Sequence, residues 1–260
     1  MKHIVAIALA LTGLAHAQET RQDRGKRVVM EALHALGGDA FLHMQDRVET
    51  GRLYSFYQQQ ISGLSVATVY TRYLTPVPGK VSLREREAFG AKQDSGYVIL
   101  TESNAWEVTF HGARELDAKT YNNFKDSTLH NALYILRQRL NEPGMSFYSQ
   151  GADVVEREPV EIVDITDADN FTVTVSFSKM TKLPVRQVYR RRNEQFHDFD
   201  TETTVFGKYR DVSGIKWPFD VWRERNGDKV FEMYADKVEI NQNLKDSLFS
   251  LPANIKMMKK

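Results

Sequence analysis

The sequence predicts an α+β fold that is mostly β, in which a curled antiparallel sheet forms an incomplete barrel. An N-terminal and a central helix are expected to pack against this sheet as a lid or plug. Two observations predict this class: ten segments of the chain have a period of two residues, and only two segments have a helical period. An antiparallel sheet of about ten or eleven strands has to curl or close to bury one apolar face.

The composition excludes several classes of protein. The chain is 42% hydrophobic, and its 35 Lys and Arg residues nearly balance 34 Asp and Glu residues. Such a hydrophobic content is typical of a globular chain rather than a disordered one. A formal net charge of +1 attracts no phosphate backbone over a distance, so we expect no nucleic-acid partner.

Residues 1–17 have the three parts of a secretory signal peptide. A basic start with Lys2 is followed by an apolar run at 4–14 and by the small-residue site Ala15-His16-Ala17. As a helix, the apolar run would rise only about 16 Å, which is half of a bilayer core. We expect cleavage after Ala17 and a periplasmic mature chain, residues 18–260, that folds as one domain. No cysteine follows the cleavage site, so we expect a soluble product without a lipid anchor.

Cysteine is absent from the whole chain. This excludes disulfides, cysteine nucleophiles and thiolate metal sites, so stability has to come from the apolar core and the hydrogen-bonded sheet.

The N-terminal helix is predicted by one apolar face. Val29, Leu33 and Leu36 follow the spacing i, i+4, i+7, and Gly37-Gly38 ends the segment.

The central helix is predicted by four leucines. Asp126 or Ser127 is the expected N-cap, residues 141–144 (Asn-Glu-Pro-Gly) end the helix, and the apolar face follows the spacing i, i+4, i+7, i+11. The leucines are Leu129, Leu133, Leu136 and Leu140.

Ten strands are predicted by alternation of apolar and polar residues. Turn residues separate them, and Asn226-Gly227 is a strong hairpin signal. The expected strands are 53–57, 66–73, 81–87, 97–101, 106–110, 171–177, 183–190, 203–211, 219–225 and 230–240.

Three apolar faces are expected to be dry and to line either a ligand cavity or a solid core. One belongs to the strand at 171–177, one to the strand at 106–110, and one to the central helix, which faces the sheet. The candidates for the ligand-binding residues are Phe171, Val173, Val175, Phe177, Trp106, Val108, Phe110, Leu129, Leu133, Leu136 and Leu140.

The catalytic motifs are weak. Residues 63–67 (Gly-Leu-Ser-Val-Ala) approach the Gly-x-Ser-x-Gly motif of serine hydrolases, but they lack the last glycine and lead into a strand. No phosphate-binding glycine loop occurs. Paired carboxylates such as Glu85 and Glu87 are expected to be solvated. We expect no catalytic residue and no cofactor.

Metal binding is not expected. The mature chain has five histidines, and none forms a His-x-x-x-His pair on one helix. The densest set of possible ligands is 197–200 (His-Asp-Phe-Asp), whose side chains would point to opposite faces of a strand.

Three segments follow one another in a recognisable order, 181–186 (TKLPVR), 209–219 (YRDVSGIKWPF) and 238–252 (VEINQNLKDSLFSLP), and Ala-Leu-Gly-Gly precedes them at 35–38. With these motifs the chain resembles the LolA/LolB-like superfamily of periplasmic lipoprotein carriers, and especially its outer-membrane lipoprotein-sorting branch, over nearly all of the mature chain. Lys182 stands where the branch usually has glycine. The resemblance implies a half-barrel capped by helices that encloses an apolar cavity for acyl chains.

Three functions remain open from the sequence. The first is a periplasmic carrier, expected to be a monomer, that binds lipoprotein acyl chains or another envelope lipid and meets a transport partner at the inner or outer membrane. The second is an envelope interaction or scaffold module with a solid β core. The third, a hydrolase of envelope lipids or glycans, lacks a recognisable nucleophile–base pair.

Overall fold

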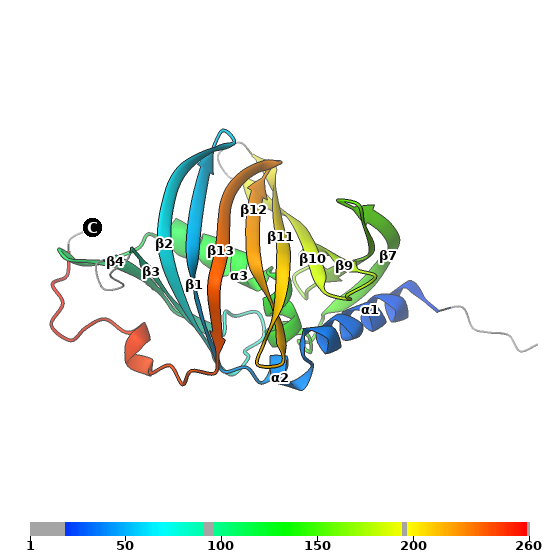
Figure 1. Cartoon of the computed structure of the whole chain (residues 1–260), viewed down its shortest axis with the longest axis horizontal. Helices are drawn as coiled ribbons and strands as arrows, with labels where there is room; N and C mark the ends of the chain where they lie inside the picture. The colour runs from blue at the N-terminus through cyan, green and yellow to red at the C-terminus, as the bar shows by residue number, and fades with distance from the viewer. Residues whose placement is uncertain (1–18, 91–95, 194–196, 259–260) are drawn as a thin grey trace, which may run out of the picture.

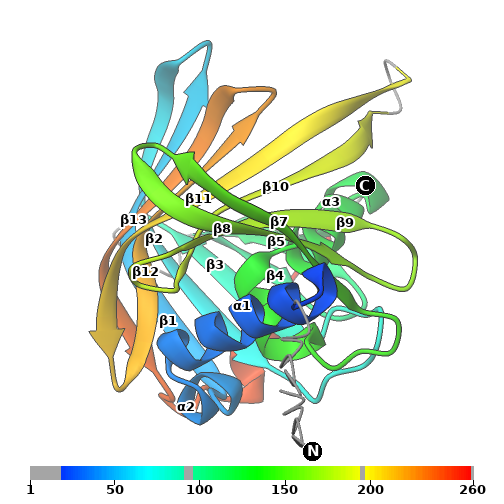
Figure 2. The same cartoon turned by 90° about the vertical axis from the view of Figure 1, so that its right-hand side faces the viewer.

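The protein is built on a single curled antiparallel sheet with its N-terminal and central helices on the concave side (Figures 1 and 2). The computed structural model describes residues 19–90, 96–193 and 197–258, so the predicted signal peptide lies outside the described residues. Thirteen strands follow the order β6-β5-β4-β3-β2-β1-β13-β12-β11-β10-β9-β8-β7. The edge strands β6 and β7 do not pair with each other in this part of the chain. The prediction of a mostly β, incomplete barrel is confirmed.

The strands form two meanders that join along one central pair. β1 pairs with β13 from Arg47–Ile240 to Ser55–Phe231, with a bulge after Thr50. The strand bounds are β1 (Asp46–Tyr57), β2 (Gln60–Tyr73), β3 (Leu83–Phe89), β4 (Gly96–Leu100), β5 (Ala105–Thr109), β6 (Gly112–Glu115), β7 (Ser146–Val155), β8 (Glu158–Thr166), β9 (Thr172–Ser178), β10 (Pro184–Asn193), β11 (Asp198–Val212), β12 (Ile215–Arg225) and β13 (Asp228–Ile240).

Short helices precede β1, link the two meanders and follow β13. They are α1 (Arg21–Leu36), α2 (Asp39–Leu42), α3 (Ala118–Leu129), α4 (Ala132–Tyr134), the π-helical turn η1 (Ile135–Arg139) and the 3₁₀ turn η2 (Asp246–Phe249). The link α3–α4–η1 runs from β6 to β7, the two opposite edges of the sheet, so it has to cross the concave side.

Helix α1 fills the concave side of the second meander. It packs against β7, β8 and β12, and its buried face includes Val29, Leu33 and Leu36, as predicted. Gly25 lies at the closest approach: a Cβ there would be 2.7 Å from the carbonyl oxygen of Phe147 on β7. Any larger residue would push the helix away from the strand.

The convex side carries a second, smaller core on the first meander. Ala88, Tyr97, Ile99, Val108 and Ala113 form it, and the C-terminal segment covers it. Leu251 and Ile255 pack on this cluster, and Met257 forms a parallel bridge with Ala113. The tail therefore acts as a cover for the outer face of β3 to β6.

Three strands, β6, β7 and β8, were not predicted. β7 is an edge strand whose side chains are mostly exposed, so it lacks a continuous apolar face. The turn between β7 and β8 uses Glu156 and Arg157 at φ of 49° and 72°, without the Gly or Asn that normally marks such a turn. The hairpin consequently carried no sequence signal.

The prediction of one continuous central helix was wrong. α3 begins at Ala118, capped by Asp117, and ends at His130. Asn131 then starts a new helix because its side-chain oxygen accepts hydrogen bonds from the N–H groups of Leu133 and Tyr134. An apolar i, i+4 spacing persists across this break, and it concealed the break in the sequence.

A charge on the filled half of the concave side should unfold the protein. Val175 is fully buried on β9, so Val175→Asp should lower the free energy of unfolding by about 3–5 kcal/mol, because no partner or water is available to the carboxylate. Urea unfolding measures the loss. Val154→Asp, the same change at a site 62% exposed, is the control and should cost less than about 0.5 kcal/mol.

Candidate functional site

The structure divides the predicted site residues between different surroundings. Val173, Val175 and Phe177 lie on the concave face, in one buried cluster with Leu133 and Leu136. Phe171 precedes β9, is half-buried and stacks on the His130 ring with centroids 3.5 Å apart. These residues are dry, and α1 and α4 cover them, so this part of the concave side is a packed core.

Trp106, Val108 and Phe110 do not face the helices. Trp106 is in register with Ile99, Arg86 and Tyr70, which places it on the convex face under the C-terminal tail. Val108 belongs to the same convex cluster, and Phe110 lies in the β5–β6 turn at 84% exposure. Alternation shows that residues share a face, but it does not show which face the helices cover.

The other two leucines lie at the margins of the concave core. Leu129, at the end of α3, is half-buried against Val81, Leu83 and Tyr134. Leu140 lines a hollow of about 280 Å³ at the lower end of the sheet. Leu42, Pro76, Pro78 and Pro143 supply apolar walls to this hollow, and Arg137 and Glu142 supply charges.

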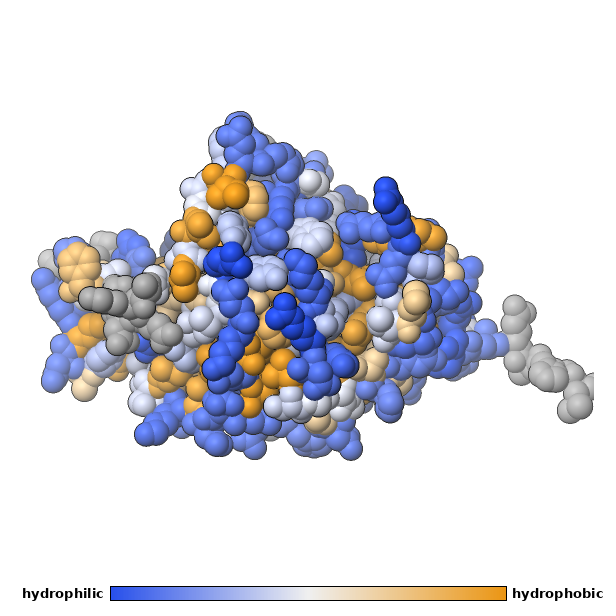
Figure 3. Space-filling model, viewed as in Figure 1, coloured by the Kyte–Doolittle hydropathy of each residue, from blue (hydrophilic) through white to orange (hydrophobic). Residues whose placement is uncertain are grey.

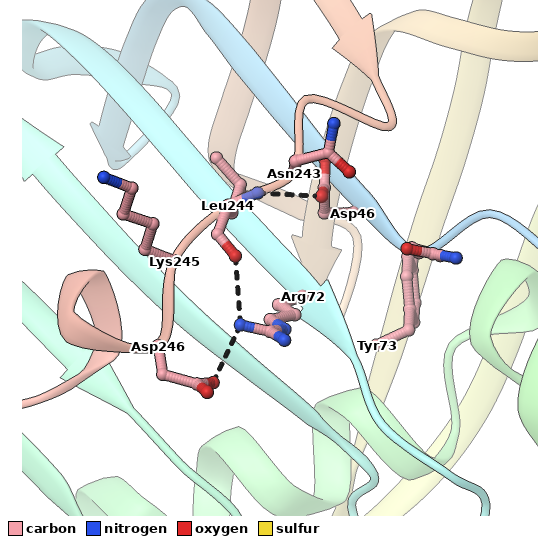
Figure 4. A pocket seen from close by; sticks show the side chains of 8 residues that line it. Asp46, Arg72, Tyr73, Asn243, Leu244, Lys245 and Asp246 are labelled. Atoms are coloured by element: carbon pink, nitrogen blue, oxygen red, sulfur yellow. Dashed lines mark hydrogen bonds and ion pairs between the residues drawn. The ribbon is translucent and has the colours of Figure 1, made fainter.

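A larger hollow of about 470 Å³ opens where β1, β2 and the C-terminal tail meet (Figure 4). Its polar groups hold the tail. The Asp46 carboxylate accepts hydrogen bonds from the backbone N–H groups of Gln242 and Leu244 at 2.6 and 3.0 Å. Arg72 donates to the Leu244 carbonyl at 3.0 Å and to Asp246 at 2.7 Å. The motif at 238–252 therefore fastens the tail to the sheet.

A polar network crosses the concave face between the core and the upper strand ends. Arg47 is 8% exposed; its guanidinium contacts the Glu49 carboxylate at 2.7 Å and donates to the Tyr73 hydroxyl at 2.7 Å and to Thr71 at 3.0 Å. It also lies 4.2 Å from the centre of the Trp217 ring. We name Arg47, Glu49, Thr71 and Tyr73 the polar belt. No sequence motif predicts the polar belt, because its members come from two strands and meet only through the register between them.

Glu85 extends the polar belt, which corrects the expectation that the Glu85/Glu87 pair is solvated. The Thr71 hydroxyl donates to its carboxylate at 3.2 Å. Burial and the neighbouring Glu87 raise the pKa of Glu85 to about 8. Loss of water and the adjacent carboxylate therefore both favour the protonated form of Glu85.

Above the polar belt, apolar side chains line the concave face without being fully buried. Leu53 is in register with Met233 and Ser65, and Val69 is in register with Glu49 and Glu87. We name this set the upper concave face: Leu53, Val69, Phe89, Val98, Val221 and Phe231, each of them half-buried.

Helix α3 runs across the concave side of the sheet and makes few contacts with it (Figure 1). None of its twelve residues is buried. The Tyr121 hydroxyl donates to the Thr101 carbonyl beyond β4 at 3.2 Å, and Arg191 on β10 donates to Asn123 at 2.7 Å. Because a helix of this length is marginal in water by itself, these contacts and the Leu129 cluster hold it in place.

The break between α3 and α4 is anchored to the sheet from inside. Buried Gln187 on β10 accepts from Ala132 N–H at 2.6 Å and donates to the His130 carbonyl at 3.1 Å. Arg139 donates to the Leu129 carbonyl at 2.8 Å and pairs with Asp167 at 3.2 Å. The C-terminal end of α3 is therefore tied to the sheet by buried groups, whereas its N-terminal half is held by the two hydrogen bonds of Tyr121 and Asn123.

Comparison with solved structures identifies the architecture. A domain from Vibrio parahaemolyticus described as an outer membrane lipoprotein-sorting protein superimposes with a TM-score of 0.61 at 9% identity, covering 88% of this chain and 97% of that one. A LolA superfamily protein from Nitrosomonas europaea gives 0.54 at 9% identity, covering 87% and 97%. The fold of this chain is similar to the folds of these two proteins.

A DUF1329 family protein from Desulfovibrio piger also superimposes, with a TM-score of 0.59 at 13% identity and coverage of 89% of this chain and 98% of that one. No family model and no curated protein matches the sequence. The likeness is therefore one of fold, as the motifs at 181–186 and 209–219 predicted.

Neither a membrane-spanning helix nor a metal site occurs in the described ranges. No helix within 19–90, 96–193 and 197–258 is long and apolar enough to cross a bilayer. Over the same residues, no group of three or more His, Asp or Glu side chains is arranged to hold a metal ion.

Protonation of the buried His130 ring makes the stability of the protein depend on pH. Burial first, and then the Arg139 charge, lower the pKa of His130 from 6.5 to about 4, although Asp167 opposes this. Because the unfolded chain then binds the proton more readily, the free energy of unfolding should fall by about 3 kcal/mol as pH falls from 6.5 to 4. Denaturant unfolding across this range measures it. His130→Phe, which keeps the stack on Phe171, should lack this part of the slope; an identical slope would contradict the assignment.

Proposed function

We propose that this protein is a non-enzymatic carrier that holds lipoprotein acyl chains, or the chains of another envelope lipid, on the upper concave face beneath α3. The observation that carries the proposal is a half-buried apolar surface on the concave side, next to a crossing helix that has no buried side chain (Figure 1). Moving α3 aside costs little buried area, and it would widen access to the concave side for a ligand.

The extent of this surface fits a lipid chain. Along β1, the distance from Glu49 in the polar belt to Ser55 near the hairpin tip is six strand residues, or roughly 20 Å. One leaflet of a bilayer core is about 15 Å thick. An acyl chain laid along the upper concave face would therefore end at the polar belt, where burying it against charged groups becomes unfavourable.

Location and partners follow from the sequence. The signal-peptide pattern at 1–17 supports export to the periplasm, and transfer toward the outer membrane would require a membrane partner that delivers or receives the lipid. The solved neighbours described as lipoprotein-sorting and LolA superfamily proteins support the carrier class.

The alternative, a scaffold module with a solid core, is favoured by one observation. The concave side under α1 is fully packed, with Val163, Val173 and Val175 at 0–1% exposure. We therefore restrict the lipid site to the half of the sheet that α3 crosses.

The direct experiment is lipid analysis of protein purified from periplasm without detergent. A carrier should retain stoichiometric lipid or lipoprotein, detected by native mass spectrometry and solvent extraction. Protein that is always empty, and that also fails to bind a fluorescent fatty-acyl probe, would refute the carrier function.

A charge on the upper concave face should abolish binding without unfolding. Leu53 is half-buried at an open mouth, so water can solvate the carboxylate of Leu53→Asp, and a charge in the acyl site should weaken probe binding at least tenfold. Fluorescence titration and thermal melting are read together. The control Val66→Asp, on the opposite face at 47% exposure, should bind like the parent.

Fixing α3 should slow exchange of the ligand. Asn123 and Arg191 are in contact, and the chain has no native cysteine, so Asn123→Cys combined with Arg191→Cys can be joined specifically by a short bis-maleimide. Stopped-flow displacement of a bound acyl probe should slow at least tenfold after cross-linking, because α3 then cannot swing out. The same double variant without the reagent is the control, and an unchanged rate would show that α3 is not the lid.

A further inference from the structure

Among the residues that the structure describes, the upper end of β2 has no neighbour on its outer side and forms a sheet edge. β3 pairs with β2 only from Ala67 to Tyr73, and the Gly90 N–H continues the pairing to the Val66 carbonyl at 2.8 Å. Within the described ranges no strand pairs with the outer side of residues 60–65. This edge is roughly 20 Å long. By strand alternation, the N–H and C=O of Leu64 point outward, as those of Val66 do.

This edge lacks the protection that the other two edges have. β6 is covered by the bridge between Ala113 and Met257, and β7 carries a bulge at Gly151 and the charge of Asp153. Residues 53–71 contain no charged side chain, although 27% of the chain is charged and a stretch of this length would carry about five. Proteins normally place Lys, Pro or charges on an exposed edge to prevent strand pairing.

Apolar side chains line the outer flank of the same edge. Leu64 is 64% exposed, Ile61 is 61% exposed and Val66 is 47% exposed. Figure 3 shows hydrophobic groups along this flank of the β1–β2 hairpin, below a hydrophilic tip. Open backbone groups beside alternate apolar side chains are the features that bind an extended peptide by strand addition.

We propose that the free edge of β2 at residues 60–65 binds the extended peptide segment that follows the acylated cysteine of a lipoprotein. The proposal rests on the carrier function and adds a second contact to it. On its concave side, this end of β2 presents only Gly63, Ser65 and Ala67, and Ser65 is in register with Leu53 of the upper concave face. A chain leaving an acyl group bound at Leu53 passes directly over this edge.

The chemistry of the edge favours a peptide over a bilayer. Gln60, Ser62 and the open backbone groups would lose their hydrogen bonds in hydrocarbon, at several kcal/mol for each unsatisfied group, whereas an added strand satisfies them. Backbone hydrogen bonds also do not depend on the amino-acid sequence of the bound peptide, and the neutral edge repels neither acidic nor basic peptides. This suits a carrier whose cargoes share the lipid but differ in sequence.

The test compares three ligands by calorimetric titration. The first is the amide of a cysteine that carries a dipalmitoyl glyceryl thioether. The second extends that cysteine by eight Ser, Thr and Asn residues. The third is the same lipopeptide with alternate residues N-methylated, which blocks strand pairing without any change in the protein. The parent should bind the second ligand about tenfold more tightly than the first or the third.

Two variants of one residue separate backbone from side chain. Leu64→Pro removes an outward N–H, a position where an edge strand tolerates proline. It should bind the lipopeptide no better than the lipid alone, with binding of the lipid unchanged. Leu64→Thr keeps the N–H and the β propensity but removes the apolar group, and its affinity should stay within about twofold of the parent. Melting temperatures confirm that both variants are folded.

Several results would overturn the proposal. Equal affinity of the parent for all three ligands would show that the peptide makes no strand contact. If Leu64→Pro and Leu64→Thr lose affinity for the lipopeptide equally, the contact is made by the side chain and not by the backbone. Binding to vesicles that both variants abolish would lead to the same conclusion. A dimer that Leu64→Pro dissociates in sedimentation would make a second copy the occupant. If the parent protein binds the lipopeptide through its peptide but does not bind the lipidated cysteine alone, the acyl site is refuted and the edge site is still supported.

Discussion

The pairing of β1 with β13 determines how the rest of the molecule is arranged. It joins two meanders side by side, so the strand that ends the first meander and the strand that begins the second lie at opposite edges of the sheet. The connection between them has to travel the width of the sheet, and the curl of the sheet leaves the concave side as its path. The loosely packed position of α3 is therefore a consequence of strand order.

The two halves of the concave side are filled differently. On the second meander, α1 inserts Val29, Leu33 and Leu36 into a packed core, and Gly25 allows the close approach that this packing needs. On the first meander, the cover is α3, and the polar belt separates the core from the upper concave face. A protein that needs both a stable fold and a removable cover can assign each to a different half, because local stability need not be uniform.

Local patterns predicted elements well and their surroundings poorly. The alternation at Val173, Val175 and Phe177 correctly indicated one dry face, since a strand alternates wherever it lies. The same pattern at Trp106 and Val108 also indicated one apolar face, but this face lies under the C-terminal tail and not under the helices. Only the register with Tyr70 and the path of the tail decide which face each segment covers. Contacts between residues far apart in sequence carry this information, and a single sequence does not contain it explicitly.

The polar belt gives the clearest example of a feature that pairing alone creates. Arg47 and Glu49 on β1 meet Thr71 and Tyr73 on β2 across a register that neither segment specifies. Burying this guanidinium is tolerable because carboxylate, hydroxyls and the Trp217 ring satisfy it on every side. The Glu49 carboxylate also accepts the indole N–H of Trp217 at 2.7 Å, which ties the belt to β12 across the central pair. The belt thus joins the two meanders with polar side chains and gives the apolar surface above it a lower boundary.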